Sequence, residues 1–315
     1  MLTFDDIQAA RRSIAGRVHL TPMFTSTAIG HEIGATVYLK AELFQKTGSF
    51  KPRGALNKIR QLTPEQKARG LITVSAGNHA QGLAYAAAAH GVACTVVMPA
   101  SASPAKVRAA RGYGATVVQH GEGGQIFDYA FTLQKERALT FVHPFDDLDV
   151  MAGQGTVGLE IVEQAPELDV VVVGVGGGGL ISGLATAIKY LRPHVKIYGV
   201  EPVGAAKMRR SLDEGRAIQL ERLETIADGL APPMAGQHTY PIVKALVEDV
   251  IIVTDAEIVT GMKVLMSRCK LMAEPAVAAA TGALLAGKVP VPPGSKVVAV
   301  VSGGNLDLDE LRNIL

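Results

Sequence analysis

Several residue types are scarce in this sequence of 315 residues. Its two cysteines, Cys94 and Cys269, are too few for a disulfide framework, which indicates a reducing, cytoplasmic location. It has no tryptophan and only 5% aromatic residues, too few for a platform that stacks single-stranded bases. The formal net charge is +2, with acids and bases intermixed, so a nucleic-acid partner is not expected. The sequence therefore predicts a small-molecule partner.

Long apolar segments are also rare. The one uncharged stretch of membrane-spanning length, residues 170–188, contains six glycines, which suit a strand, a turn and a helix better than a membrane helix. The first thirteen residues include Asp5 and Asp6 and lack the apolar centre of a signal peptide. We expect a soluble chain with no membrane partner.

What the sequence does contain is an alternation of apolar, β-branched runs with alanine-rich helical segments. Runs that are apolar on both faces are typical of parallel sheets covered by helices. The pattern predicts an α/β architecture with doubly wound sheets, but leaves open whether there are one or two. Strands are expected at 71–74, 94–98, 116–119, 141–142, 170–173, 196–200, 250–254 and 297–301, and helices at 52–60, 80–89, 104–111, 180–191 and 255–268.

The segment 45–55, QKTGSFKPRGA, places a lysine at the start of a predicted helix. Pro52 suits the first helical turn, where a missing backbone N–H costs nothing. The amine of Lys51 would form a Schiff base readily if it were desolvated and uncharged. Taken alone, however, Lys51 could be an ordinary surface lysine.

Three further motifs follow predicted strands. Segment 75–82, SAGNHAQG, opens a helix, and the free amides there attract an anion such as a carboxylate. Segment 174–180, GVGGGGL, can surround a phosphate with amides. It also satisfies G-x-G-x-x-G, with Glu201 where a ribose-binding acid would lie, so a nucleotide-dependent dehydrogenase is the alternative from another class. Segment 297–305 ends in a third such turn, SGGN.

Together these motifs resemble those of the fold-type II pyridoxal-phosphate (PLP) enzymes, in the threonine/serine dehydratase branch that includes threonine ammonia-lyase and serine racemase. The resemblance extends from residues 21–22 to residues 302–305. It implies two doubly wound, mostly parallel sheets, as in the tryptophan synthase β fold. The large PLP-binding domain would comprise 1–67 and 148–315, and a small mobile domain 68–147. It also implies a homodimer and a short form without a regulatory domain.

The resemblance implies the site residues as well. Lys51 would bind PLP and act in catalysis. Contacts with the cofactor are implied for Phe50, Lys51, Asn78, Gly176, Gly177, Gly178, Gly179, Leu180, Gly229, Glu274 and Ser302, and with the substrate for Ser75, Ala76, Gly77, Asn78 and His79. Ser302 would face the pyridine nitrogen. Because a hydroxyl cannot stabilise a full positive charge there, the ring becomes a weaker electron sink, which disfavours transamination and leaves β-elimination accessible.

Two departures from the family pattern refine the prediction. Ala76 stands where racemases carry a serine that transfers a proton, and a methyl group cannot do so. Lys207 stands where several relatives have an aspartate that completes a cation site with Glu201 and the Ala205 carbonyl. An ammonium there would repel a cation, so no metal is predicted.

The expected activity is elimination of water from a β-hydroxy amino acid, L-threonine and/or L-serine, giving a 2-oxo acid and ammonia. Other activities stay open: a serine racemase, a dehydratase of a larger substrate such as hydroxyaspartate or phenylserine, a β-replacement enzyme, and a non-enzymatic ligand-binding module. His143 and most other histidines are interpreted as surface or core residues, and Asp146 and Asp147 as solvated loop acids.

Overall fold

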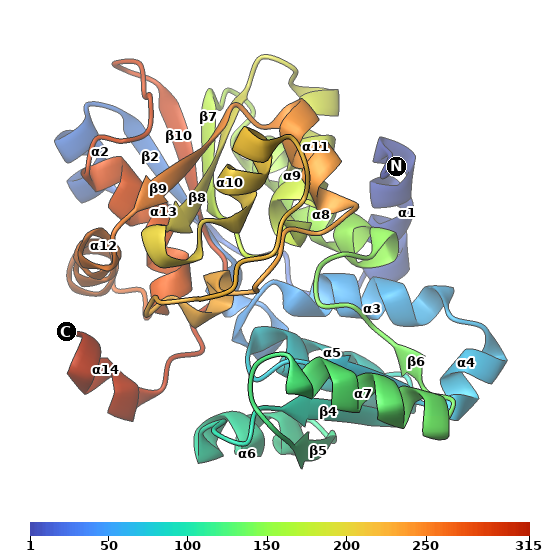
Figure 1. Cartoon of the computed structure of the whole chain (residues 1–315). Coiled ribbons are helices and arrows are strands. Elements are labelled where there is room, and N and C mark those ends of the chain that lie inside the picture. Colours follow the sequence, from blue (N-terminus) through green and yellow to red (C-terminus); the bar gives the residue numbers. More distant parts are fainter.

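Two separate β-sheets organise the chain, and helices cover both (Figure 1). The structure is a computed structural model that describes residues 1–315, apart from the side chains of residues 310 and 313. The strands are β1 (Met23–Thr25), β2 (Thr36–Ala41), β3 (Leu71–Val74), β4 (Cys94–Met98), β5 (Thr116–Gln119), β6 (Thr140–Phe141), β7 (Val170–Gly174), β8 (Lys196–Pro202), β9 (Asp249–Val253) and β10 (Lys296–Val301).

The larger sheet has six strands in the order β1-β2-β10-β7-β8-β9, and the smaller has four in the order β5-β4-β3-β6. All neighbouring strands are parallel except β1 and β2, which are antiparallel. The predicted α/β fold with mainly parallel sheets is therefore confirmed, and the number of sheets is two. The strands of the smaller sheet all lie within the region predicted for the inserted domain, whose boundaries stay a prediction.

The helices fill the connections between strands. They are α1 (Phe4–Ile14), α2 (Thr27–Ile33), α3 (Lys51–Gln61), α4 (Pro64–Arg69), α5 (Asn78–Ala88), α6 (Pro104–Gly112), α7 (Gln125–Glu136), α8 (Leu148–Gln164), α9 (Gly179–Leu191), α10 (Lys207–Glu214), α11 (Thr239–Leu246), α12 (Asp255–Ser267), α13 (Pro275–Leu285) and α14 (Leu308–Ile314), with short 3₁₀ turns η1 (Glu42–Phe44), η2 (Lys46–Gly48), η3 (Val203–Ala205) and η4 (Asp228–Leu230). Within the described residues, none of these helices is long and apolar enough to cross a membrane.

Most predicted elements lie where the sequence placed them. The strands at 71–74, 94–98 and 116–119 have the predicted bounds. Helix α5 begins at Asn78, two residues before the expected start, and Gly77 precedes it with a non-helical backbone (φ −125°, ψ −141°). Asn78 and His79 therefore belong to the first turn of the helix. Strand β6 is shifted by one residue, to 140–141.

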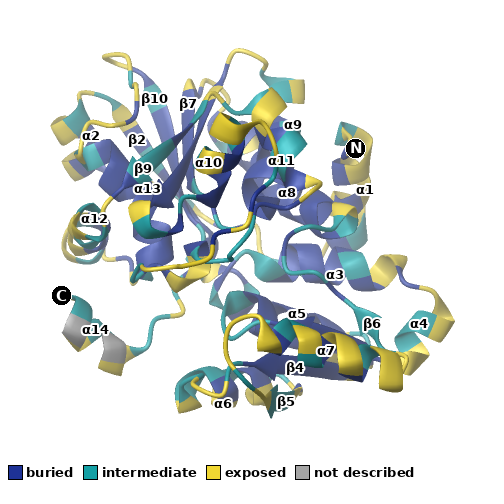
Figure 2. Ribbon diagram, in the orientation of Figure 1, coloured by how far each residue is buried: buried dark blue, intermediate teal, exposed yellow. Residues whose placement is uncertain are grey.

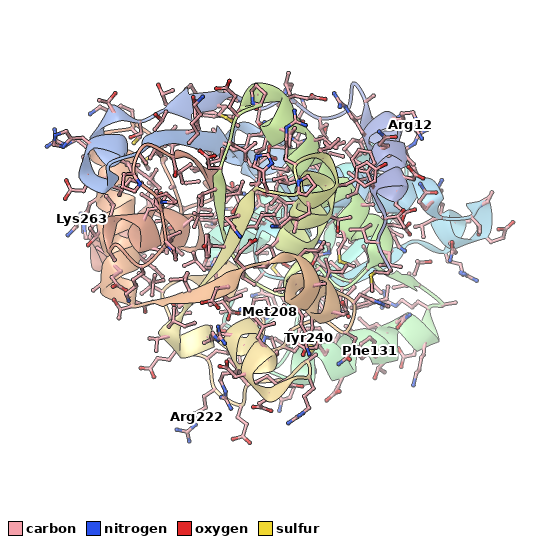
Figure 3. The ribbon with its side chains drawn as sticks, turned by 90° about the horizontal axis from the view of Figure 1, so that it is seen from above. Arg12, Phe131, Met208, Arg222, Tyr240 and Lys263 are labelled. Atoms are coloured by element: carbon pink, nitrogen blue, oxygen red, sulfur yellow. The ribbon has the colours of Figure 1, made fainter. Side chains whose placement is uncertain are left out.

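The valine-rich strand β7 shows why the larger sheet is buried on both faces. Val170 and Val172 pack into one hydrophobic core, which α13 covers, whereas Val171 and Val173 pack into another, beneath α8 and α9. Side chains alternate between faces along a strand, so a continuous run of valines requires apolar layers on both sides. Figure 2 shows β7 as buried along most of its length. Charged side chains such as Arg12, Arg222 and Lys263 project from separate places on the surface (Figure 3).

Candidate active site

A cavity of about 490 Å³ lies between the two sheets, next to the carboxyl ends of β3, β7 and β10. Parallel α/β sheets place ligands at this edge, because the helix N-termini that follow the strands point there. Every residue that the sequence assigned to cofactor or substrate lines this one cavity: Phe50, Lys51, Ser75, Ala76, Gly77, Asn78, His79, Gly176, Gly177, Gly178, Gly179, Leu180, Gly229, Glu274 and Ser302. Their individual roles stay predictions.

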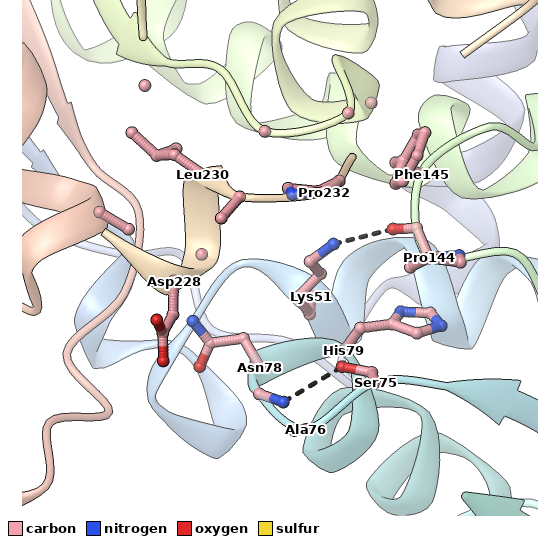
Figure 4. A pocket seen from close by; sticks show the side chains of 18 of the residues that line it. Lys51, Ser75, Ala76, Asn78, His79, Pro144, Phe145, Asp228, Leu230 and Pro232 are labelled. Carbon is pink, nitrogen blue, oxygen red and sulfur yellow. Dashed lines mark hydrogen bonds between the residues drawn. The ribbon is translucent and has the colours of Figure 1, made fainter. Parts of the chain in front are cut away.

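Lys51 begins α3 and extends its amine into the cavity (Figure 4). Its Nζ atom donates a hydrogen bond to the Pro144 carbonyl at 2.8 Å. Burial lowers the pKa of Lys51 to about 8, although the nearby Glu274 carboxylate opposes the shift. Gly82 of α5 is required beside it, since a Cβ at that position would lie 2.8 Å from the Lys51 Cβ. The amine is thus held in place and is partly uncharged near neutral pH.

The lowered pKa predicts how the free protein reacts with aldehydes. Only the neutral amine attacks a carbonyl, so capture of PLP by cofactor-free protein, trapped with borohydride, should be half-maximal near pH 8. An ordinary lysine would give a midpoint near ~10.4. Glu274→Gln should move the midpoint lower still, because the carboxylate raises the Lys51 pKa. A midpoint that stays near that of an exposed lysine would contradict the assignment.

Asn78 is held by two partners from other parts of the chain. Its Nδ2 donates to Glu274 Oε1 at 2.6 Å, and its Oδ1 accepts from Asn305 Nδ2 at 2.6 Å. The same Asn305 amide donates to the Thr47 carbonyl at 2.7 Å. Burial raises the pKa of Glu274 to about 7. These contacts fix which end of the Asn78 amide is the donor, so this side chain can offer its N–H₂ to an oxygen in the cavity.

The glycine loop before α9 has a shape that side chains would block. Gly178 adopts φ +96°, a left-handed conformation that glycine adopts without strain. A Cβ on Gly177 would lie 2.2 Å from the Phe145 ring, and one on Gly179 would lie 2.8 Å from the Phe145 carbonyl. The loop therefore passes close to residue 145 with bare backbone, and its amides and the N-terminus of α9 can bind a phosphate.

The start of α3 is attached to the end of β10. The Phe50 N–H donates to the Ser302 carbonyl at 3.1 Å, which brings Lys51 and the Ser302 side chain to the same cavity.

Behind α3, the fully buried Arg53 holds the helix to its neighbours. Its guanidinium makes paired hydrogen bonds to Glu42, both at 2.8 Å, and reaches Glu160 at 2.6 Å. Lys40 shares Glu160 at 2.6 Å, so two cations and two carboxylates neutralise one another.

The segment 143–145 forms a wall of the cavity that the sequence analysis did not predict. The sequence alone indicated that His143 is a surface or core residue. In the structure, His143 lines the cavity with Pro144 and Phe145. Asp146 is not a merely solvated acid either, because it accepts hydrogen bonds from the backbone of Gln237 and His238 at 2.9 and 2.8 Å. A usable signal existed: the segment follows the carboxyl end of β6, the same edge from which the other site loops leave their strands.

The Lys207 ammonium contacts the two groups, Glu201 and the Ala205 carbonyl, that would bind a cation in several relatives. This buried ammonium is 3.0 Å from Glu201 Oε1 and donates to the Ala205 carbonyl at 3.1 Å. It also donates to the carbonyls of Val175 at 3.1 Å and Leu230 at 2.6 Å. The Lys207 ammonium thus joins the glycine loop, at Val175, to the η4 turn, at Leu230. In the part of the chain that the structure describes, no group of three His, Cys, Asp or Glu side chains could hold a metal.

The prediction that no metal binds at Glu201 can be tested by calorimetry. Titration with magnesium or manganese should give no heat that depends on Glu201, because a second cation would lie against the Lys207 ammonium. Tight binding that Glu201→Ala abolishes would overturn this prediction.

Comparison with known proteins identifies the family. A model of the family described as "Pyridoxal-phosphate dependent enzyme" matches residues 14–303. The chain belongs to this family. It is 44% identical to the L-threonine ammonia-lyase of Thermotoga maritima, over 100% of this chain and 78% of that protein. Membership makes PLP the cofactor and removes both the nucleotide-dependent dehydrogenase and the non-enzymatic module from consideration.

Solved structures of this PLP enzyme family have the same fold. Maize serine racemase superposes with a TM-score of 0.95 at 38% identity, covering 99% of this chain and 96% of that one. The processed form of threonine deaminase isoform 2 from Solanum lycopersicum gives a TM-score of 0.92 at 34% identity, covering 99% and 86%. The predicted fold-type II architecture is therefore confirmed.

Proposed function

We propose that this enzyme removes water from a β-hydroxy amino acid, L-threonine and/or L-serine, and that hydrolysis of the resulting unsaturated amine takes up one water and gives a 2-oxo acid and ammonia. The observation that carries the proposal is the one-sided proton chemistry of the cavity. Lys51 offers an amine with a pKa of about 8, whereas position 76 of the opposing loop carries only a methyl group. The similarity to L-threonine ammonia-lyase supports the same reaction.

The cavity fits PLP in three respects. It contains a lysine with a lowered pKa, a loop of bare glycine backbone before a helix, and the Ser302 hydroxyl at the end of β10. When bound, PLP supplies the electron sink that makes the substrate α-proton acidic. Lys51 would attach the cofactor, the Gly176–Gly179 loop and Leu180 would hold its phosphate, and Ser302 would face its ring nitrogen. Phe50, Gly229 and Glu274 would surround the ring, and Asn78 would donate to the ring hydroxyl.

The remaining residues would bind the substrate and move its proton. The amides of Ser75, Ala76, Gly77 and Asn78, at the N-terminus of α5, would hold the substrate carboxylate. His79 would complete this loop from the first turn of the helix. Lys51, as the neutral amine, would take the α-proton, and positioned bases of this kind accelerate such steps about 10²–10⁴-fold. The electron pair left by the α-proton can then expel the β-hydroxyl. Return of a proton to the opposite face, which would give racemisation, is disfavoured because Ala76 has no proton to transfer.

Racemisation is the second candidate, since maize serine racemase has the same fold. Ala76→Ser would restore the missing hydroxyl, and it should raise the ratio of D-serine formed to ammonia released relative to the parent enzyme. An unchanged ratio would mean that position 76 does not control the outcome.

Assembly, domains and location complete the proposal. We propose that the enzyme is a cytoplasmic homodimer. Within each chain, the small domain, residues 68–147, would close on the large domain, residues 1–67 and 148–315, and exclude water from the reaction. Two contacts that cross the cavity support such a closure: Asn78 with Glu274, and Lys106 with Asp228 at 2.8 Å. Light scattering of the holoenzyme would measure the mass expected for two chains.

The decisive experiment combines spectroscopy with product analysis. The PLP-loaded protein should absorb near ~410–420 nm, and the band should disappear with borohydride. Ammonia release should then be measured over serine, threonine, hydroxyaspartate and phenylserine. Turnover of serine or threonine above the larger substrates supports the proposal. A PLP band without ammonia release from any of them would refute it.

A further inference from the structure

His143 is a polar side chain in the cavity wall to which neither the family resemblance nor the roles above give a function. It follows β6 and precedes Pro144, whose carbonyl accepts the hydrogen bond from Lys51 at 2.8 Å. The imidazole is therefore one residue along the chain from a direct contact of the catalytic amine. Both His143 and Lys51 line the cavity, together with Ser75.

The backbone fixes which ring nitrogen of His143 carries the proton. The N–H groups of Asp146 and Phe145 both donate to its Nδ1 atom, at 2.8 and 3.3 Å. A nitrogen that accepts hydrogen bonds from amides must keep its lone pair, so Nδ1 is unprotonated. Burial lowers the pKa of His143, and the charge on Lys51 acts in the same direction, against the opposing effects of Asp146 and Asp147. The ring is then neutral, with its single proton on Nε2.

Two aromatic rings hold the plane of the imidazole. The Phe145 ring stands perpendicular to it, at 90° with 4.5 Å between ring centres. The Phe141 ring packs edge-on at 6.1 Å. With Nδ1 also bonded, the ring is oriented by contacts on several sides. Among the described residues, Nε2 has no hydrogen-bond partner, and this atom is not fully buried.

We propose that the Nε2–H group of His143 is a fixed donor to the β-hydroxyl oxygen of the substrate, and that it selects β-hydroxy amino acids. This inference rests on the proposed function. The substrate carboxylate is already provided for by the amides at the start of α5, and the α-carbon by Lys51. The β-substituent is the remaining polar group, and His143 lines the same cavity one residue before the Pro144 carbonyl that accepts the Lys51 hydrogen bond.

A donor at this position would assist the reaction as well as binding. The β-oxygen gains negative charge as its bond to carbon breaks, so a preorganised N–H binds it more strongly in the transition state than in the bound substrate. The imidazole keeps its own proton throughout, because loss of that proton would leave an anionic ring in a buried site. His143 is thus a hydrogen-bond donor in this proposal and not a general acid.

A pair of substitutions separates the two nitrogens of the ring. His143→Asn keeps an acceptor near the Nδ1 position, which preserves the backbone contacts of residues 145 and 146, but removes the outer donor. His143→Gln places an amide N–H₂ near the Nε2 position and gives up the inner acceptor. The PLP absorbance band and the unfolding midpoint of each holoenzyme report whether the site has survived.

The test compares substrates that differ in the leaving group. For His143→Asn, kcat/KM for serine and threonine should fall about 10- to 100-fold, as for loss of one donor to developing charge. With β-chloro-L-alanine, whose chloride leaves as a stable anion and accepts hydrogen bonds poorly, kcat/KM should stay within about 3-fold of the parent value. His143→Gln should retain more serine turnover than His143→Asn.

Other results would overturn the inference. Equal losses on serine and β-chloro-L-alanine would make His143 a structural residue, and no loss on either would leave it without a role. Failure of the proposed function looks different, because the parent enzyme itself would then release no ammonia from serine or threonine while still binding PLP.

Discussion

Lys51→Ala is expected to lower ammonia release from serine and threonine by about 10⁴-fold or more, because it removes both the covalent attachment of the cofactor and the base that takes the α-proton. The visible band that borohydride reduces should vanish as well. Among the described residues that line the cavity, the other lysine is Lys106, and its amine is paired with Asp228. Steady-state kinetics with PLP in excess would measure the loss.

A neighbouring lysine provides the matched control for this prediction. Lys46 lies in the same motif, five residues earlier, but does not line the cavity. Lys46→Ala should keep turnover within about 3-fold, as expected for a side chain that touches neither cofactor nor substrate. Addition of a small primary amine should restore part of the activity of Lys51→Ala if an amine is all that is missing. Turnover by Lys51→Ala above one hundredth of the parent rate would disprove the catalytic role.

Arg53→Met should destabilise the protein by about 3–5 kcal/mol, the range seen when one partner of a buried ion pair is removed. Arg53 is fully buried and binds the carboxylates of Glu42 and Glu160. Methionine fills much of the same volume, but among the described residues it leaves Glu160 with Lys40 and Glu42 with Thr21 as side-chain hydrogen-bond partners. Urea unfolding of the holoenzyme, followed by circular dichroism, would measure the change.

A surface ion pair calibrates this result. Asp213→Ala removes one of the two carboxylates that pair with Arg209 of α10, and the Arg209 and Asp213 side chains are 32% and 56% exposed to solvent. Surface pairs of this kind contribute about 0–1 kcal/mol. Arg53→Lys keeps the charge but loses the paired geometry, so it should fall between the two. A loss below about 1 kcal/mol for Arg53→Met would show that the network does not stabilise α3.

The local structure of this protein could be predicted from its sequence. Valine runs such as 170–173 are apolar on both faces, and that property is set by a few neighbouring residues. The same is true of the glycine turns at 174–179 and of the amides that follow Gly77 at the start of α5. Side-chain period and turn chemistry extend over ten residues or fewer, so strands, helix starts and anion-binding loops needed no tertiary information.

Tertiary contacts decided the rest of the site. Lys51 and Pro144 are 93 positions apart, and Asn78 and Asn305 are 227 apart, yet each pair is joined by a hydrogen bond. No periodicity brings such residues together; only the packing of the two sheets around one cavity does. The lowered Lys51 pKa has the same origin, because burial is a property of the assembled fold. His143 is an example of what the sequence alone does not reveal. No motif includes this histidine, whereas in the structure the neighbouring backbone amides donate to its Nδ1 and leave its proton on Nε2.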